Sequence, residues 1–99
     1  MMEHRLDIRI EAPLDVVIHN DDGDTLQTRA NNLSRGGVSI EMDESLGLKE
    51  KKLVLVEFME EHLSTKIPAL VIQTTTVTAS LMFIEYSPEL HAFLSNHHR

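Results

Sequence analysis

The chain contains no cysteine among its 99 residues. Disulfide frameworks, thiol nucleophiles and cysteine-ligated zinc or iron–sulfur sites are therefore excluded. The sequence also has no run that approaches the roughly 18 apolar residues of a membrane-spanning helix, and its first residues, MMEHRLDIR, lack the apolar core of a signal peptide. We therefore expect a cytoplasmic protein with no membrane insertion.

Basic and aromatic residues are both scarce. Nine Lys and Arg residues stand against 16 Asp and Glu residues, which gives a formal net charge of −7 and disfavours binding to a nucleic-acid polymer or an anionic membrane. Aromatic residues make up 4% of the chain, too few for the stacking platforms of an OB-like nucleic-acid binder. The hydrophobic content of 41% is enough for one packed core in a single domain.

Short apolar stretches with a period of two follow one another along the chain and predict six strands. An Asp22-Gly23 step between the first two stretches is typical of a tight hairpin turn. Pro68 lacks an amide donor and predicts an edge position or a bulge within the fifth strand. The expected strands cover residues 14–19, 25–30, 36–42, 53–58, 64–74 and 77–86.

The end of the chain follows a helical pattern instead. Ser87 is a good capping residue, Pro88 suits the first helical position, and Leu90, Phe93 and Leu94 share one face. We therefore predict a mostly β protein, a small six-stranded antiparallel barrel with a C-terminal helix over a barrel mouth or a sheet edge. Within this single domain we expect an N-terminal arm or edge strand at residues 1–12, the barrel at 13–86 and the helix at 87–99.

Four of the five arginines lie within the first 35 residues. Two of them, Arg5 and Arg9, form an RxxxR sequence. A guanidinium is a planar fork of donors that can bind a phosphate or the O6/N7 edge of guanine with two hydrogen bonds. Alone, this spacing is better explained by solvated arginines paired with Asp7 or Glu11.

A second motif lies between the expected second and third strands. The segment Asn32-Leu33-Ser34-Arg35-Gly36-Gly37 fits [D/N]xSxxG, a pattern that composition alone would give about 0.03 times in this chain. Asn, Ser and Gly are also ordinary turn residues, so a purely structural role remains open for each of them. The joint occurrence of the two motifs favours a site for a small planar anion.

With both motifs in this order, the sequence resembles the PilZ domain, a bacterial receptor module for the second messenger cyclic di-GMP. The resemblance runs from Arg5 to the end of the chain and implies a six-stranded barrel, with Phe83 as an aromatic core residue. It further implies that Arg5 and Arg9 clamp phosphate and guanine and that Asn32, Ser34 and Gly37 form the barrel side of the site. Arg35 is a further candidate contact. The chain departs from the family pattern at Ser80, where glycine is common, and at Gln73, where a basic residue is frequent.

The resemblance implies a receptor that changes conformation when it binds cyclic di-GMP and signals through an unidentified protein partner. The same barrel could instead serve as a protein–protein adaptor that binds no nucleotide. We expect no enzymatic activity, because no nucleophile motif or glycine-rich phosphate loop is present. We also expect no metal site, no cofactor, and a monomer or weak homodimer.

Overall fold

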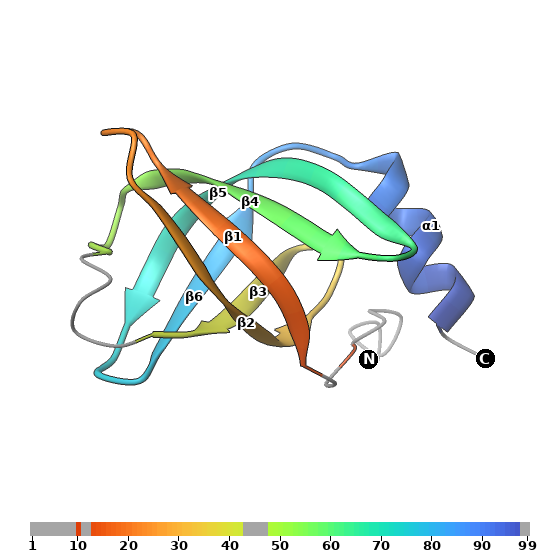
Figure 1. Cartoon of the computed structure of the whole chain (residues 1–99), viewed down its shortest axis with the longest axis horizontal. Helices are drawn as coiled ribbons and strands as arrows, with labels where there is room; N and C mark the ends of the chain where they lie inside the picture. Colours follow the sequence, from red (N-terminus) through yellow and green to blue (C-terminus); the bar gives the residue numbers. More distant parts are fainter. Residues whose placement is uncertain (1–9, 11–12, 43–47, 98–99) are drawn as a thin grey trace, which may run out of the picture.

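The computed structural model describes residue 10, residues 13–42 and residues 48–97. Within these ranges the chain forms a closed antiparallel barrel of six strands with one helix at the C-terminal end, as the sequence predicted (Figure 1). Around the barrel the strands follow the order β1-β2-β3-β6-β5-β4. Their bounds are β1 Leu14–Asn20, β2 Thr25–Leu33, β3 Gly37–Glu41, β4 Leu53–Glu60, β5 Leu63–Thr74 and β6 Thr78–Phe83.

The core fills the inside of the barrel with the alternate residues of each strand. Successive side chains of a strand point to opposite faces, so Leu14, Val16 and Ile18 of β1 point inward while Asp15 is exposed. Phe58 lies in the centre with no exposed surface, and its ring meets that of Phe83 edge-on at a centroid distance of 6.2 Å. No polar or charged side chain is buried in the described ranges, so apolar burial is the main force that holds the barrel together.

Two expected strand-breaking features can be located. The hairpin turn between β1 and β2 forms where Asp22-Gly23 predicted it, with Gly23 at a φ of 97°. Pro68 lies in the middle of β5 and is not the bulge of that strand, because the register shift falls between Val71 and Gln73. β6 ends at Phe83, and just beyond it the Ile84 amide donates to the Pro68 carbonyl at 3.0 Å. Proline has no amide to return this bond, so the ladder between β5 and β6 ends at this point.

The helix α1, Pro88–His97, lies across one end of the barrel beside the turn between β4 and β5 (Figure 1). Its first turn is capped by Ser87, whose Oγ accepts the amide of Leu90 at 3.1 Å. Leu90, Phe93 and Leu94 are buried on its inner face against the core, with β5 as the neighbouring strand. The sequence predicted that the helix covers either a barrel mouth or a sheet edge, and in the structure it covers a barrel mouth. No helix of the described residues is long and apolar enough to cross a membrane.

Candidate functional site

The [D/N]xSxxG segment forms the tight connection between β2 and β3 at the barrel end that carries α1 (Figure 1). Asn32 belongs to the end of β2 and Gly37 begins β3. The Ser34 amide donates to the carbonyl of Gly37 at 2.9 Å, and the Phe83 amide donates to the carbonyl of Gly36 at 2.9 Å. The turn is thus held by backbone hydrogen bonds on both sides, while Arg35 at its tip is exposed.

A β-bulge in β2 decides which way Asn32 points. The register shifts between Ala30, opposite Ile40, and Asn32, opposite Ser39, so Asn31 is an extra residue. The bulge allows Ala30 and Leu33, three residues apart, both to be buried with 0% exposure. In a regular strand Asn32 would share the inward face with Ala30. The bulge therefore brings Asn32 to the outer surface.

Gly37 is required by the close approach of β6. A Cβ at this position would overlap the carbonyl oxygen of Leu81 and lie 3.5 Å from the Cα of Met82. The obstacle is backbone, which cannot rotate away as a side chain can. The neighbouring Gly36 has nothing within 4 Å of an added Cβ. The second glycine of the motif thus has a packing role in the barrel wall.

A hollow of about 400 Å³ opens on the outer face beside this turn. Its floor contains a row of short polar side chains that the strand register aligns: Asn32 of β2 lies opposite Ser39 of β3, which lies opposite Ser80 of β6. Gln73 of β5 lies opposite Ser80 and continues the row along the barrel surface. The exposed side chain of Met82 forms part of the apolar lining.

Sequence reasoning named Asn32, Ser34 and Gly37 for this site but missed Ser39 and treated Ser80 only as a departure from the family pattern. The structure brings all five into the lining of one hollow. A signal was present in the sequence, because Ser39 and Ser80 are each flanked by buried apolar residues and must point outward in a strand of period two. The pairing of the two strands, which the sequence does not give, was needed to bring them together.

None of the ten described residues that line the hollow carries a charge. From these ten residues an anion would meet no carboxylate, in spite of the net charge of −7. Cationic groups must come from outside the lining. Arg35 supplies a guanidinium in an adjoining hollow that shares Ser34 and Gly36 with the first.

The predicted arm residues Arg5 and Arg9 lie outside the described residues. Ile10, which follows Arg9 in the sequence, forms an isolated antiparallel bridge with Leu33. Its amide donates to the Leu33 carbonyl at 2.8 Å, and its carbonyl accepts the Leu33 amide at 2.9 Å. Leu33 separates Asn32 from Ser34 in the chain, so the bridge fixes residue 10 against the motif.

The described residues contain no group of three or more His, Cys, Asp or Glu side chains that could hold a metal ion. The chemistry offered by the site is therefore neutral hydrogen bonding from amide and hydroxyl groups, with an apolar contact on one side and arginine nearby.

The fold is thus a closed six-stranded antiparallel barrel with a terminal helix over one mouth and an [N]xSxxG turn on its wall. The model of the PilZ domain family matches residues 3–97, nearly the whole chain, and the protein belongs to this family. No curated protein sequence matches the chain.

Solved structures agree with this fold. The PilZ domain of CeSA from a cellulose-synthesizing bacterium aligns with a TM-score of 0.75 at 18% identity, over 92% of this chain and 98% of that one. The Bacillus subtilis inhibitor of motility, MotI/DgrA, aligns with a TM-score of 0.75 at 21% identity, over 96% of this chain and 50% of that protein. The PilZ domain of YcgR from Escherichia coli, solved with c-di-GMP, aligns with a TM-score of 0.74 at 22% identity, over 97% of this chain and 89% of that one.

Proposed function

We propose that this protein is a receptor for cyclic di-GMP that works without catalysis in the bacterial cytoplasm. The observation that carries the proposal is the polar hollow built from the [N]xSxxG turn and the Asn32–Ser39–Ser80 row, with Ile10, the residue that follows RxxxR in the sequence, bridged to Leu33 of the motif. The YcgR domain solved with c-di-GMP has the same fold, which supports this choice of ligand.

The hollow would receive a guanine base. Guanine presents the acceptors O6 and N7 and donors on its other edge, and the amide of Asn32 can both donate and accept. The hydroxyls of Ser34, Ser39 and Ser80 can do the same and adapt to the edge they meet. The exposed side chain of Met82 offers an apolar surface for the base plane.

The two phosphates of the ligand would be neutralised by arginine. The described residues that line the hollow include no cation, so we assign the phosphate contacts to Arg5 and Arg9. Arg35 is a further candidate contact of the ligand. In this proposal residues 1–12 are an arm that closes over the ligand, and the bridge between Ile10 and Leu33 is its anchor on the barrel. Each bidentate contact would contribute about 1–3 kcal/mol, so its loss weakens binding roughly 10- to 100-fold.

The signal would pass to a protein partner. Leu53 of β4, Leu70 of β5 and Met82 of β6 lie opposite one another in one outward row, and the first and last are exposed. Exposed apolar surface of this kind is typical of protein interfaces. Because Met82 also lines the hollow, a bound ligand would contact one end of this apolar row. Binding would then alter the surface that the row offers to a protein partner.

The experiment is isothermal titration calorimetry of the whole chain with cyclic di-GMP and, separately, with cyclic di-AMP. We expect heat of binding with cyclic di-GMP alone, because adenine replaces the O6 acceptor with an amino donor. Arg9→Ala and Asn32→Ala should each weaken binding roughly tenfold or more.

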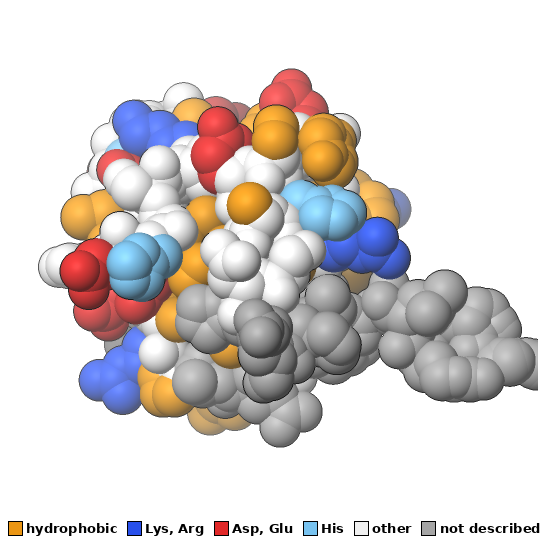
Figure 2. All heavy atoms as spheres, turned by 90° about the vertical axis from the view of Figure 1, so that its right-hand side faces the viewer, with side chains coloured by type: hydrophobic (Ala, Val, Ile, Leu, Met, Phe, Trp, Pro, Cys, Tyr) orange, Lys and Arg blue, Asp and Glu red, His pale blue; other side chains and the backbone are white. Residues whose placement is uncertain are grey.

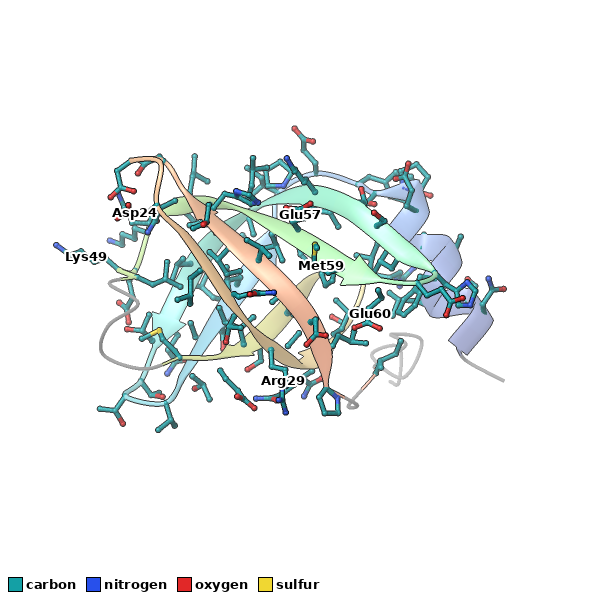
Figure 3. All side chains as sticks on the ribbon, in the orientation of Figure 1. Asp24, Arg29, Lys49, Glu57, Met59 and Glu60 are labelled. Atoms are coloured by element: carbon teal, nitrogen blue, oxygen red, sulfur yellow. The ribbon has the colours of Figure 1, made fainter. Side chains whose placement is uncertain are left out.

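Two matched variants control for charge and for general effects of truncation. Arg29→Ala removes the same charge from a side chain that projects outward from β2 (Figure 3) and lines a different hollow with Asp15 and Glu41. Asn96→Ala removes an exposed amide on α1. Both should bind as the unmodified chain does. Absence of heat with cyclic di-GMP would refute the receptor and leave the nucleotide-free adaptor as the better account.

A further inference from the structure

A second hollow adjoins the first on the other side of the Ser34–Gly36 turn. It also measures about 400 Å³ and lies between the turn, the segment that leads into α1 and the first turns of that helix. Its lining includes Arg35, Tyr86, Leu90 and His91. Figure 2 faces this end of the molecule and shows histidine side chains among hydrophobic, acidic and basic ones. The proposed function leaves this hollow unused except for Arg35.

Tyr86 gives the second hollow an aromatic wall. The side chain is 75% exposed, although its ring is large and apolar. The His91 ring lies against it at a centroid distance of 5.8 Å and an angle of 60°, which limits its freedom on one side. Because Tyr86 is not buried in the core, a planar ligand can stack on the exposed face of its ring without displacing core side chains.

The polar groups around the ring favour a base over a phosphate. The start of α1 is a weak anion site, because Ser87 Oγ already accepts the Leu90 amide and Glu89 lies in the first turn. The guanidinium of Arg35 can instead form two hydrogen bonds with the O6/N7 edge of guanine or stack on its plane. Leu90 adds an apolar contact of the kind that bases use.

We propose that this second hollow is a guanine subsite in which Tyr86 stacks on the base and Arg35 binds its O6/N7 edge. The inference rests on the proposed receptor function and extends it to a two-base site that spans the Ser34–Gly36 turn. The base is either the second guanine of the same cyclic di-GMP or a guanine of a second ligand molecule. Because α1 forms one wall, occupancy of this subsite ties the ligand to the helix that closes the barrel.

The chain itself provides the probe, because Tyr86 is its only tyrosine and it has no tryptophan. Cyclic di-GMP is titrated into the full chain while tyrosine emission is recorded, and calorimetry follows binding in parallel. Free tyrosine amide at the same concentration corrects for absorption of light by the ligand. We expect the emission to be quenched with the same midpoint as the heat. One ligand per chain assigns the subsite to the second base of one molecule, and two ligands assign it to a second molecule.

Three variants complete the test. Tyr86→Ala should weaken binding about 5- to 150-fold, the range found for loss of one base–aromatic stack. Tyr86→Phe keeps the ring and should bind within about twofold of the unmodified chain. Val77→Ala truncates a 64% exposed side chain that lines neither hollow and should have no effect.

The outcomes separate the subsite from the receptor. Binding heat with unchanged tyrosine emission, or with wild-type affinity in Tyr86→Ala, would overturn the subsite and leave the receptor intact. A chain that gives no heat with cyclic di-GMP would overturn both.

Discussion

The substitution Gly37→Ala, which adds one methyl group, tests whether this glycine of the motif is needed for β3 to pack against β6. In Gly37→Ala the new Cβ would overlap the Leu81 carbonyl oxygen and lie 3.4 Å from the carbonyl carbon of the same residue. Gly37 lies opposite Met82 in the ladder between β3 and β6. Relief of the clash therefore requires these two strands to separate locally or the peptide of Leu81 to rotate.

The loss of stability depends on how easily the backbone of β6 can move away from the new methyl group. Overpacking of a well-packed site costs typically 1–3 kcal/mol, and the upper part of that range applies here because the obstacle is backbone in a closed barrel. A domain of this size has a total stability of roughly 5–15 kcal/mol. We therefore expect Gly37→Ala to lose about 2–3 kcal/mol and its melting temperature to fall by roughly 8–24 °C.

Urea unfolding and thermal unfolding, both without ligand, measure the effect, and Gly36→Ala is the control. Gly36 precedes Gly37 directly, has open space around an added Cβ, and has no left-handed φ. Alanine there also restricts the unfolded chain, so this variant should be unchanged or more stable by up to about 1 kcal/mol. The two variants differ by one position and have the same composition.

The reasoning would be refuted if Gly37→Ala unfolded at the same urea concentration as Gly36→Ala. If Gly37→Ala kept full stability and lost only affinity for cyclic di-GMP, the glycine would serve the ligand site and not the packing of the barrel wall. A loss of stability without ligand shows that the last residue of the motif holds β3 against β6.

Two further predictions concern the core and the helix that closes it. Phe58→Ala should cost about 3–5 kcal/mol in urea unfolding, because the side chain has 0% exposure. The adjacent Met59, which is 51% exposed and projects away from β4 (Figure 3), should tolerate alanine with a change of at most about 0.5 kcal/mol. Ser87→Ala should cost about 1 kcal/mol, because it removes the acceptor of the Leu90 amide, whereas alanine at the exposed Ser95 of α1 should cost nothing. A Ser87→Ala variant as stable as Ser95→Ala would show that the cap contributes nothing to the stability of the barrel.

The order and type of the elements could be predicted from the sequence because their signals are local. Alternation of apolar residues marks a strand wherever one face is buried, and the cap at Ser87 followed by Pro88 marks the start of a helix. The observed ends differ from the predicted ones at several strands. β2 continues past residue 30 to Leu33, since the bulge interrupts its alternation without ending the strand.

The composition of the site could not be predicted to the same extent, because it depends on two bulges that have no clear local signal. The shift at Asn31 turns Asn32 outward, and the shift between Val71 and Gln73 leaves Ile72 exposed and sets Gln73 opposite Ser80. A change of register by one residue reverses the face of every following side chain. Counting by two along β2 from Ala30 would therefore have placed Asn32 inside the barrel.

The motif contributes to the site through the way it pairs the strands on either side of it. Within the motif, Gly37 lets β6 approach β3 closely, and that approach sets Ser80 beside Ser39. The bulge before the motif then adds Asn32 to the same row, and the bridge between Leu33 and Ile10 holds residue 10 beside the motif. Ser80 is far in sequence from Asn32 and Ser39, and none of the three side chains carries chemistry that would single it out alone. A short motif can therefore predict where a ligand binds, whereas the polar groups that meet the ligand follow from how the strands on either side are paired.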